Sequence, residues 1–107
     1  SEPQPDLTLL KPRADYYTES HPGPEDVLLL IEVADTTART DRQAKVPLYA
    51  RAGIQEVWLV DLEANAVEVY REPSPEGYRS LQRLGRGEFL APQAFPEASL
   101  PLSELLG

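Results

Sequence analysis

The stretch VLLLIEVADTTARTDRQAKVPLYARAG, residues 27–53, decides the fold. From Val27 to Val33 every residue except Glu32 is aliphatic, which is typical of a strand that is covered on both faces. An isolated carboxylate is too costly to leave unpaired in a protein interior. Glu32 must therefore be hydrogen-bonded, protonated or bound to a cation, and it marks a candidate polar site inside the predicted sheet.

The segment after this strand has the spacing of a helix. At about 100° per residue, one stripe of that helix contains Asp41, Ala44, Lys45, Leu48, Tyr49 and Ala52. The stripe predicts that Lys45 lies on the face that packs against the rest of the protein.

Both ends of the predicted helix carry recognisable signals. Thr36, Thr37 or Thr40 can cap its beginning, and Gly53 is suited to its end. Pro47 lies inside the helix and removes one backbone donor, so we expect a kink or a later start.

Shorter alternating segments surround this unit and predict further strands. They are DLTLLK (6–11), EVWLVD (56–61), AVEVYR (66–71), YRSLQRL (78–84) and a short piece near Phe89, with a helical turn at 103–106. Residues 27–61 then form a β-α-β unit with parallel strands. The sequence predicts a single α/β domain with a mixed β-sheet over residues 1–107.

Composition excludes several classes of function. The 107-residue chain has a formal net charge of −8, which argues against non-specific binding to nucleic acids or membranes by the chain as a whole. It has no cysteine, so disulfides and thiolate metal sites are excluded. No apolar stretch approaches the roughly 18 residues of a membrane span. We therefore expect a cytoplasmic protein without a membrane partner.

Asp6, Glu32 and Lys45 are the candidate catalytic residues. Two carboxylates on adjacent strands can hold Mg²⁺, which polarises a phosphate and activates water, while a lysine stabilises the negative charge that develops. The alternative is structural: Glu32 and Lys45 form a buried ion pair, and Asp6 caps the start of its strand. The spacing alone leaves both interpretations open.

Three further residues are accessory candidates, and two of them have an alternative. Asp35 can hold a second metal or water, or cap the following helix. Tyr49 can contact a phosphate through its hydroxyl, or simply pack in the core. Arg42 belongs to the one locally basic cluster of this acidic chain, which comprises Arg39, Arg42, Lys45 and Arg51.

The combination PDLTLL, LLLIEVADTT and DRQAKVPLYARAGIQEVWLVDLEANAVEVYR resembles the Uma family of restriction-endonuclease-like proteins. This family is a branch of the PD-(D/E)XK nuclease superfamily, and the resemblance covers about Gln4 to Arg71. It implies a restriction-endonuclease-like core in which Asp6 and Glu32 bind Mg²⁺, with Mn²⁺ as a substitute. Ala34 stands where the superfamily motif has its lysine, and the resemblance implies that Lys45 on the helix replaces it.

The resemblance implies a Mg²⁺-dependent endonuclease that hydrolyses phosphodiester bonds of DNA. Because cutting both strands of a duplex needs two active sites or two events, a homodimer would suit this activity. The alternative is a catalytically inactive binding or assembly module that keeps Glu32 and Lys45 as an ion pair. Relatives carry further helices and strands before the Pro-Asp strand, so we expect the chain to be N-terminally incomplete.

Overall fold

The computed structural model describes residues 6–35 and 37–107. Its elements, in chain order, are β1 (Leu7–Leu10), a 3₁₀ turn η1 (Pro24–Asp26), β2 (Val27–Ala34), α1 (Arg39–Arg51), β3 (Glu56–Asp61), β4 (Ala66–Ser74), β5 (Gly77–Gly85), β6 (Phe89–Leu90), β7 (Leu100–Pro101) and α2 (Leu102–Leu106). All the predicted strands are present, β4 and β5 are longer than predicted, and β7 was not predicted. No helix among the described residues is long and apolar enough to cross a membrane.

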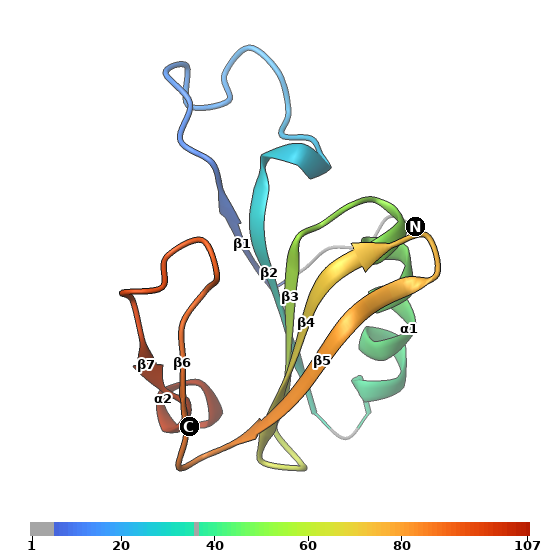
Figure 1. Cartoon of the computed structure of the whole chain (residues 1–107), viewed down its shortest axis with the longest axis vertical. Helices are drawn as coiled ribbons and strands as arrows, with labels where there is room; N and C mark the ends of the chain where they lie inside the picture. Colours follow the sequence, from blue (N-terminus) through green and yellow to red (C-terminus); the bar gives the residue numbers. More distant parts are fainter. Residues whose placement is uncertain (1–5, 36) are drawn as a thin grey trace.

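Five strands form one mixed sheet in the order β1-β2-β3-β4-β5 (Figure 1). Strands β2 and β3 are parallel, and the other neighbouring pairs are antiparallel. Helix α1 connects the two parallel strands, which confirms the predicted β-α-β unit. The α/β class with a mixed sheet is confirmed as well.

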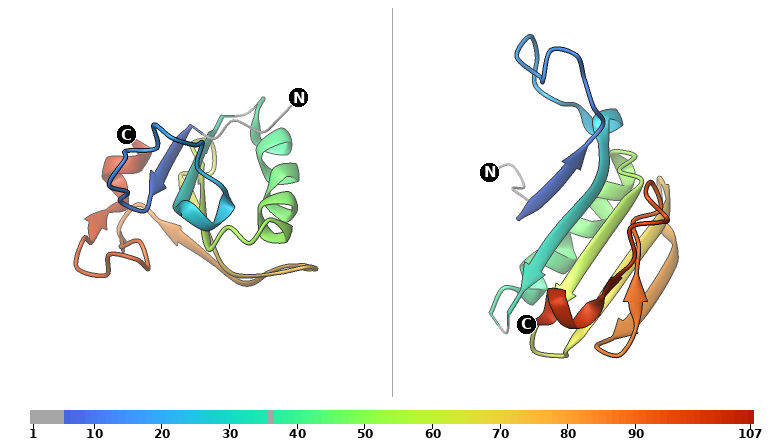
Figure 2. Two further views of the ribbon diagram at one scale, coloured as in Figure 1. Left: turned by 90° about the horizontal axis from the view of Figure 1, so that it is seen from above. Right: turned by 90° about the vertical axis from the view of Figure 1, so that its left-hand side faces the viewer.

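The two faces of the sheet are covered by different parts of the chain. Helix α1 packs on one face, while β6, β7 and α2 lie against the other (Figure 2). Because strand side chains alternate between faces, Leu30 and Ala34 of β2 belong to the α1 face, and Leu29 and Ile31 belong to the opposite core. Glu32 shares the parity of Leu30 and therefore points toward α1.

The end of α1 follows from Gly53. Its φ of +82° is a left-handed conformation that glycine adopts without steric cost. The amide of Gly53 donates to the Ala50 carbonyl and that of Ile54 to the Tyr49 carbonyl, both at 3.0 Å. This is the Schellman arrangement, which satisfies the last carbonyls of a helix. The predicted end is confirmed, and α1 runs through Pro47.

The predicted threonine caps are wrong for the part of the turn that the structure describes. The N-cap residue of α1 is Ala38, which makes no side-chain cap, and Thr40 lies inside the helix. Asp35 instead closes the turn before the helix: its Oδ1 accepts hydrogen bonds from the amides of Thr37 and Ala38, each at 3.0 Å. Thr36 lies outside the described residues.

The buried side of α1 differs from the predicted stripe by about one residue. The buried positions are Val46, Tyr49 and Ala50, and Lys45 is half-buried. Four members of the predicted stripe are exposed, namely Asp41, Ala44, Leu48 and Ala52. Arg39 and Arg42 are ion-paired with carboxylates of the sheet. These ion pairs turn the side of α1 that carries Arg39 and Arg42 toward the sheet. The spacing of apolar residues alone therefore gave the wrong rotation of the helix about its axis.

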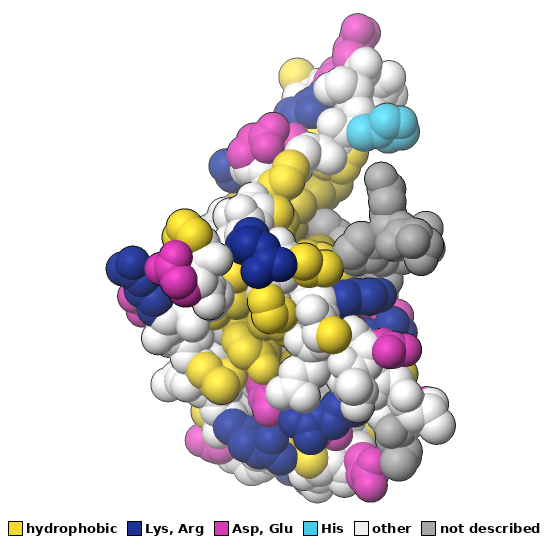
Figure 3. All heavy atoms as spheres, turned by 90° about the vertical axis from the view of Figure 1, so that its right-hand side faces the viewer, with side chains coloured by type: hydrophobic (Ala, Val, Ile, Leu, Met, Phe, Trp, Pro, Cys, Tyr) yellow, Lys and Arg dark blue, Asp and Glu magenta, His cyan; other side chains and the backbone are white. Residues whose placement is uncertain are grey.

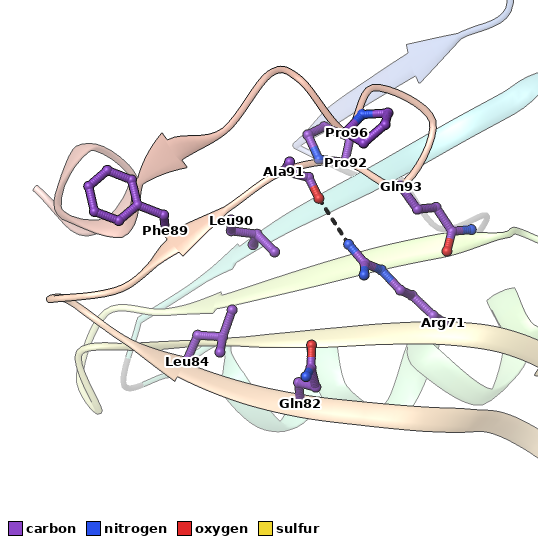
Figure 4. A pocket seen from close by; sticks show the side chains of 9 residues that line it. All are labelled: Arg71, Gln82, Leu84, Phe89, Leu90, Ala91, Pro92, Gln93 and Pro96. Carbon is purple, nitrogen blue, oxygen red and sulfur yellow. Dashed lines mark hydrogen bonds between the residues drawn. The ribbon is translucent and has the colours of Figure 1, made fainter.

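A buried carboxylate on the other face ties the C-terminal part to the sheet. Glu56 is completely buried, and its Oε2 accepts from Trp58 Nε1 at 2.7 Å and Arg71 Nε at 2.8 Å. Its Oε1 accepts from the Gln93 amide at 2.8 Å. Arg71 also reaches the Ala91 carbonyl at 2.9 Å across a pocket (Figure 4). Removing the arginine would leave Glu56 without its cation.

We therefore predict that Arg71→Ala lowers the free energy of unfolding by about 3–5 kcal/mol, the usual cost of breaking a buried pair from one side. Urea denaturation followed by circular dichroism measures this change. Arg79→Ala removes an exposed arginine of β5 and should change stability by less than about 0.5 kcal/mol. Equal losses in the two variants would contradict the role of Arg71.

Candidate functional site

The candidate site lies where β1 begins and β2 approaches its end. The antiparallel register pairs Leu7 with Ile31 and Thr8 with Leu30, so one further step places Asp6 beside Glu32. Thr8 and Leu30 both line the apolar pocket on the α1 side, which gives Asp6 and Glu32 the same face by alternation. The sheet thus brings the two predicted carboxylates together under α1.

Glu32 is a completely buried carboxylate with only one of its oxygens satisfied. The Tyr49 hydroxyl donates to Oε2 at 2.8 Å. Oε1 is buried and accepts no hydrogen bond from the described residues. The cation nearest to it is Arg42, whose Nε lies 3.9 Å away. Oε1 of Glu32 therefore remains available to coordinate a cation.

Asp6 is exposed and connects the two strands through its side chain. Its Oδ2 accepts a 2.7 Å hydrogen bond from the Val33 amide. Its Oδ1 lies 3.7 Å from Arg42 Nη2. The contact with the Val33 amide extends the pairing of β1 with β2, so one oxygen of Asp6 stabilises the start of β1. The other oxygen of Asp6 faces Arg42.

Arg42 of α1 stands between the two carboxylates. Besides its contacts with Asp6 and Glu32, its Nε donates to the Val33 carbonyl at 3.3 Å. Both ion-pair distances exceed hydrogen-bonding range. Arg42 balances the charge of the pair without saturating either carboxylate.

Lys45 lies on the same side of α1 as the residues that touch Glu32. Positions 42, 45 and 49 are spaced i, i+3 and i+7, so they follow one another along one helical stripe. Arg42 and Tyr49 contact Glu32 from the two ends of this stripe, and Lys45, which is half-buried, lies between them. The Lys45 side chain thus starts from the same helical stripe as the two side chains that contact Glu32.

The Glu32–Lys45 ion pair of the structural alternative is not formed. Among residues 6–35 and 37–107, no hydrogen bond or ion pair joins the Lys45 side chain to another residue. The rotation of α1 places Arg42 and Tyr49 directly over Glu32 instead. Arg42 is thus the internal partner that the sequence interpretation assigned to Lys45.

The accessory candidates separate into two groups. Tyr49 and Arg42 belong to the site, because both contact Glu32. Asp35 is exposed, and hydrogen bonds from the Ala38 amide and from Thr37 hold the pKa of its carboxyl below the usual range. Its side chain holds the turn that leads into α1 and does not cap the helix itself.

A second charged cluster on the same face was not predicted. Glu32, Leu59 and Glu68 are paired in register across β2, β3 and β4, so the two glutamates occupy one row. Glu68 accepts from the Tyr70 hydroxyl at 2.8 Å, while Arg39 and Arg83 lie 3.3 and 3.1 Å from its Oε2.

Asp61 completes this cluster. Its Oδ2 lies 3.1 Å from Arg39 Nε, although the two groups are not aligned as a hydrogen bond. Its Oδ1 accepts from the Ala64 amide at 3.0 Å. The sequence did contain a signal for this cluster, because Asp61 ends one predominantly apolar strand and Glu68 interrupts the next.

The Asp6–Glu32 site fits a divalent cation by its donor chemistry. Carboxylate oxygens are the ligands that Mg²⁺ prefers, and the orphaned Glu32 Oε1 is a buried acceptor that lacks a donor. Within the described ranges, no group of three or more histidine, cysteine, aspartate or glutamate side chains gathers in metal-binding geometry. Two carboxylates would therefore be supplemented by the Val33 carbonyl or by water.

Comparisons with known proteins agree with this architecture. The profile of the family described as "Uma2: Putative restriction endonuclease" matches residues 1–103. A solved structure titled as a putative nuclease belonging to DUF820, from Anabaena variabilis ATCC 29413, is similar with a TM-score of 0.60 and 20% identity. The match covers 75% of this chain and 44% of that one, and at this identity it shows the fold. No curated protein matches.

Tyr49 predicts a pH dependence of stability. Burial and the hydrogen bond to Glu32 raise the pKa of its hydroxyl. Folding therefore favours the neutral phenol, and this stabilisation is complete below pH about 10, the value for an unfolded tyrosine, and is lost as the pH rises toward the higher folded value. We therefore predict that urea denaturation shows a smaller loss of stability in Tyr49→Phe than in wild type when the pH is raised from about 9 to about 11, on either side of the pKa of an unfolded tyrosine.

The exposed Tyr16 provides the control for this measurement. Tyr16→Phe should follow the wild-type pH dependence. If Tyr49→Phe did the same, the Tyr49 hydroxyl would not be the group that the fold keeps neutral.

Proposed function

Because this chain belongs to the Uma2 family of restriction-endonuclease-like proteins, we propose that it is a divalent-metal-dependent endonuclease that hydrolyses phosphodiester bonds of DNA. The observation that carries the proposal is the meeting of Asp6 and Glu32 at one cation, with a buried oxygen of Glu32 still lacking a donor. Two acids, one just before β1 and one in β2, converge there and can supply carboxylate oxygens to the ion that metal-assisted hydrolysis uses.

Each residue of the site has a role in this proposal. Asp6 and Glu32 would hold Mg²⁺, or Mn²⁺ in its place. When bound, such an ion polarises the phosphate and lowers the pKa of an attacking water. The Tyr49 hydroxyl fixes Glu32 through Oε2, which leaves Oε1 free for the ion.

Lys45 supplies the second positive charge. On its half-buried stripe between Arg42 and Tyr49, its ammonium would stabilise the charge that builds up on the phosphate oxygens during hydrolysis. It takes the part that the superfamily motif gives to a lysine at the position of Ala34. Ala34 itself is completely buried beneath α1, where a lysine side chain would have no room.

The substrate must be recognised locally, because the chain carries a formal net charge of −8. On the face shown in Figure 3, basic and acidic side chains are interspersed and do not form one continuous positive surface. A DNA backbone would therefore meet positive charge mainly at α1 and its surroundings. A homodimer would place two such sites on one duplex and allow both strands to be cut.

A catalytically inactive binding or assembly module is the second candidate. The observation in its favour is Arg42, which already balances Asp6 and Glu32 from within the protein. Calorimetric titration with Mg²⁺ separates the two functions. Binding that disappears in Glu32→Gln supports the nuclease, and the absence of binding in wild type supports the inactive module.

The direct test of the nuclease is cleavage of supercoiled plasmid DNA in the presence of Mg²⁺ or Mn²⁺. We predict that Lys45→Ala lowers the cleavage rate by about 10²–10³-fold, the usual effect of removing a group that stabilises transition-state charge. Asp6→Asn and Glu32→Gln should abolish cleavage.

The matched control is Lys11→Ala, because Lys11 is the other lysine of the chain and is exposed. It makes the same charge change and should cleave at the wild-type rate. Equal activity in wild type and Lys45→Ala would refute the role of Lys45, and metal-independent cleavage would refute the metal mechanism.

A further inference from the structure

The two buried glutamates of the α1 face are partnered to different degrees. Both accept a tyrosine hydroxyl at 2.8 Å, Glu32 from Tyr49 and Glu68 from Tyr70. The second oxygen of Glu68 is bound by two guanidinium groups. The second oxygen of Glu32 accepts no hydrogen bond from the described residues. Both oxygens of Glu68 therefore have hydrogen-bond donors, whereas one oxygen of Glu32 has none among the described residues.

The arginines that serve these glutamates differ in the same way. Arg39 and Arg42 are three residues apart on α1, so they project toward the sheet from adjacent turns. Arg39 lies 3.1 Å from Asp61 and 3.3 Å from Glu68. Arg42 keeps 3.7 Å from Asp6 and 3.9 Å from Glu32. Arg39 is thus locked in a tight network, while Arg42 is only loosely held.

Arg42 can leave its position at low cost. Its two ion-pair distances are longer than those of Arg39, and its single side-chain hydrogen bond, to the Val33 carbonyl, is long at 3.3 Å. The carbonyl lies on an exposed residue, so water can replace the guanidinium there. By contrast, Asp6 and Glu32 are held in place by the Val33 amide and by Tyr49.

We propose that Arg42 is a tethered counter-ion that competes with the divalent cation for Asp6 and Glu32. Without the metal, the guanidinium holds the two carboxylates together against their mutual repulsion. When the metal binds, the guanidinium swings out toward solvent, because two cations cannot share the same oxygens at this distance. Arg42 thereby sets the metal concentration at which the site becomes loaded. This inference rests on the metal-dependent function proposed above.

The test is calorimetric titration of the whole chain with MnCl₂. Arg42→Gln should bind Mn²⁺ about tenfold more tightly than wild type, because the competing charge is gone. Arg51→Gln is the matched control, since Arg51 is an exposed arginine at the end of the same helix and its loss makes the same change in net charge. Its affinity should stay within about twofold of wild type.

A second measurement uses the wild-type protein and does not depend on the folding of a variant. In ¹⁵N NMR spectra, titration with Mg²⁺ should speed the exchange of the Arg42 Nε proton with water. The Nε proton of Arg39, which faces Asp61, should remain unchanged.

The outcomes distinguish this inference from the proposed function. If Arg42→Gln binds Mn²⁺ no more tightly than Arg51→Gln while the wild-type protein binds the metal and cleaves DNA, Arg42 is not a competitor and only the inference fails. If the affinity rises as expected but no variant cleaves DNA, the inference stands and the nuclease assignment fails. If neither wild type nor Arg42→Gln binds Mn²⁺, both are overturned.

Discussion

The burial of the Glu32 carboxylate beneath α1 is the constraint on which the site depends. A carboxylate removed from water carries a desolvation penalty of several kcal/mol, which only close partners offset. The partners of Glu32 come from α1, which supplies Tyr49 and Arg42. The position of the helix over the sheet is thus coupled to one acidic side chain. Asp6 joins the same point from β1 through the Val33 amide, so three elements are tied together at the candidate metal centre.

Much of the fold could be predicted from local patterns. The aliphatic run that ends in Val33 and the glycine at position 53 marked a buried strand and a helix end, and the β-α-β unit followed from their order. These features depend on propensities that act over a few residues. The two-residue strand β7 could not be predicted, because its pairing with β6 joins residues about ten positions apart and carries little periodicity of its own.

The rotation of α1 is the main point at which the sequence misled. Apolar spacing favoured a stripe through Leu48, which is exposed. The helix instead presents Arg39 and Arg42 to carboxylates of the sheet, a long-range electrostatic match that no helical wheel contains. The types and positions of Asp6 and Glu32 could be predicted, but the partner of Glu32 could not. That partner is an arginine one turn before Lys45, and the choice depends on tertiary geometry alone.

The central claim is that Asp6 and Glu32 form a cation site that Arg42 occupies until a metal displaces it. A crystal structure of the protein soaked with Mn²⁺, with an anomalous difference map, tests this claim most directly. The account predicts an anomalous peak within coordination distance of both carboxylates, with the Arg42 guanidinium moved away from Glu32. The account would be contradicted by a map that shows no peak there and leaves Arg42 in contact with both acids.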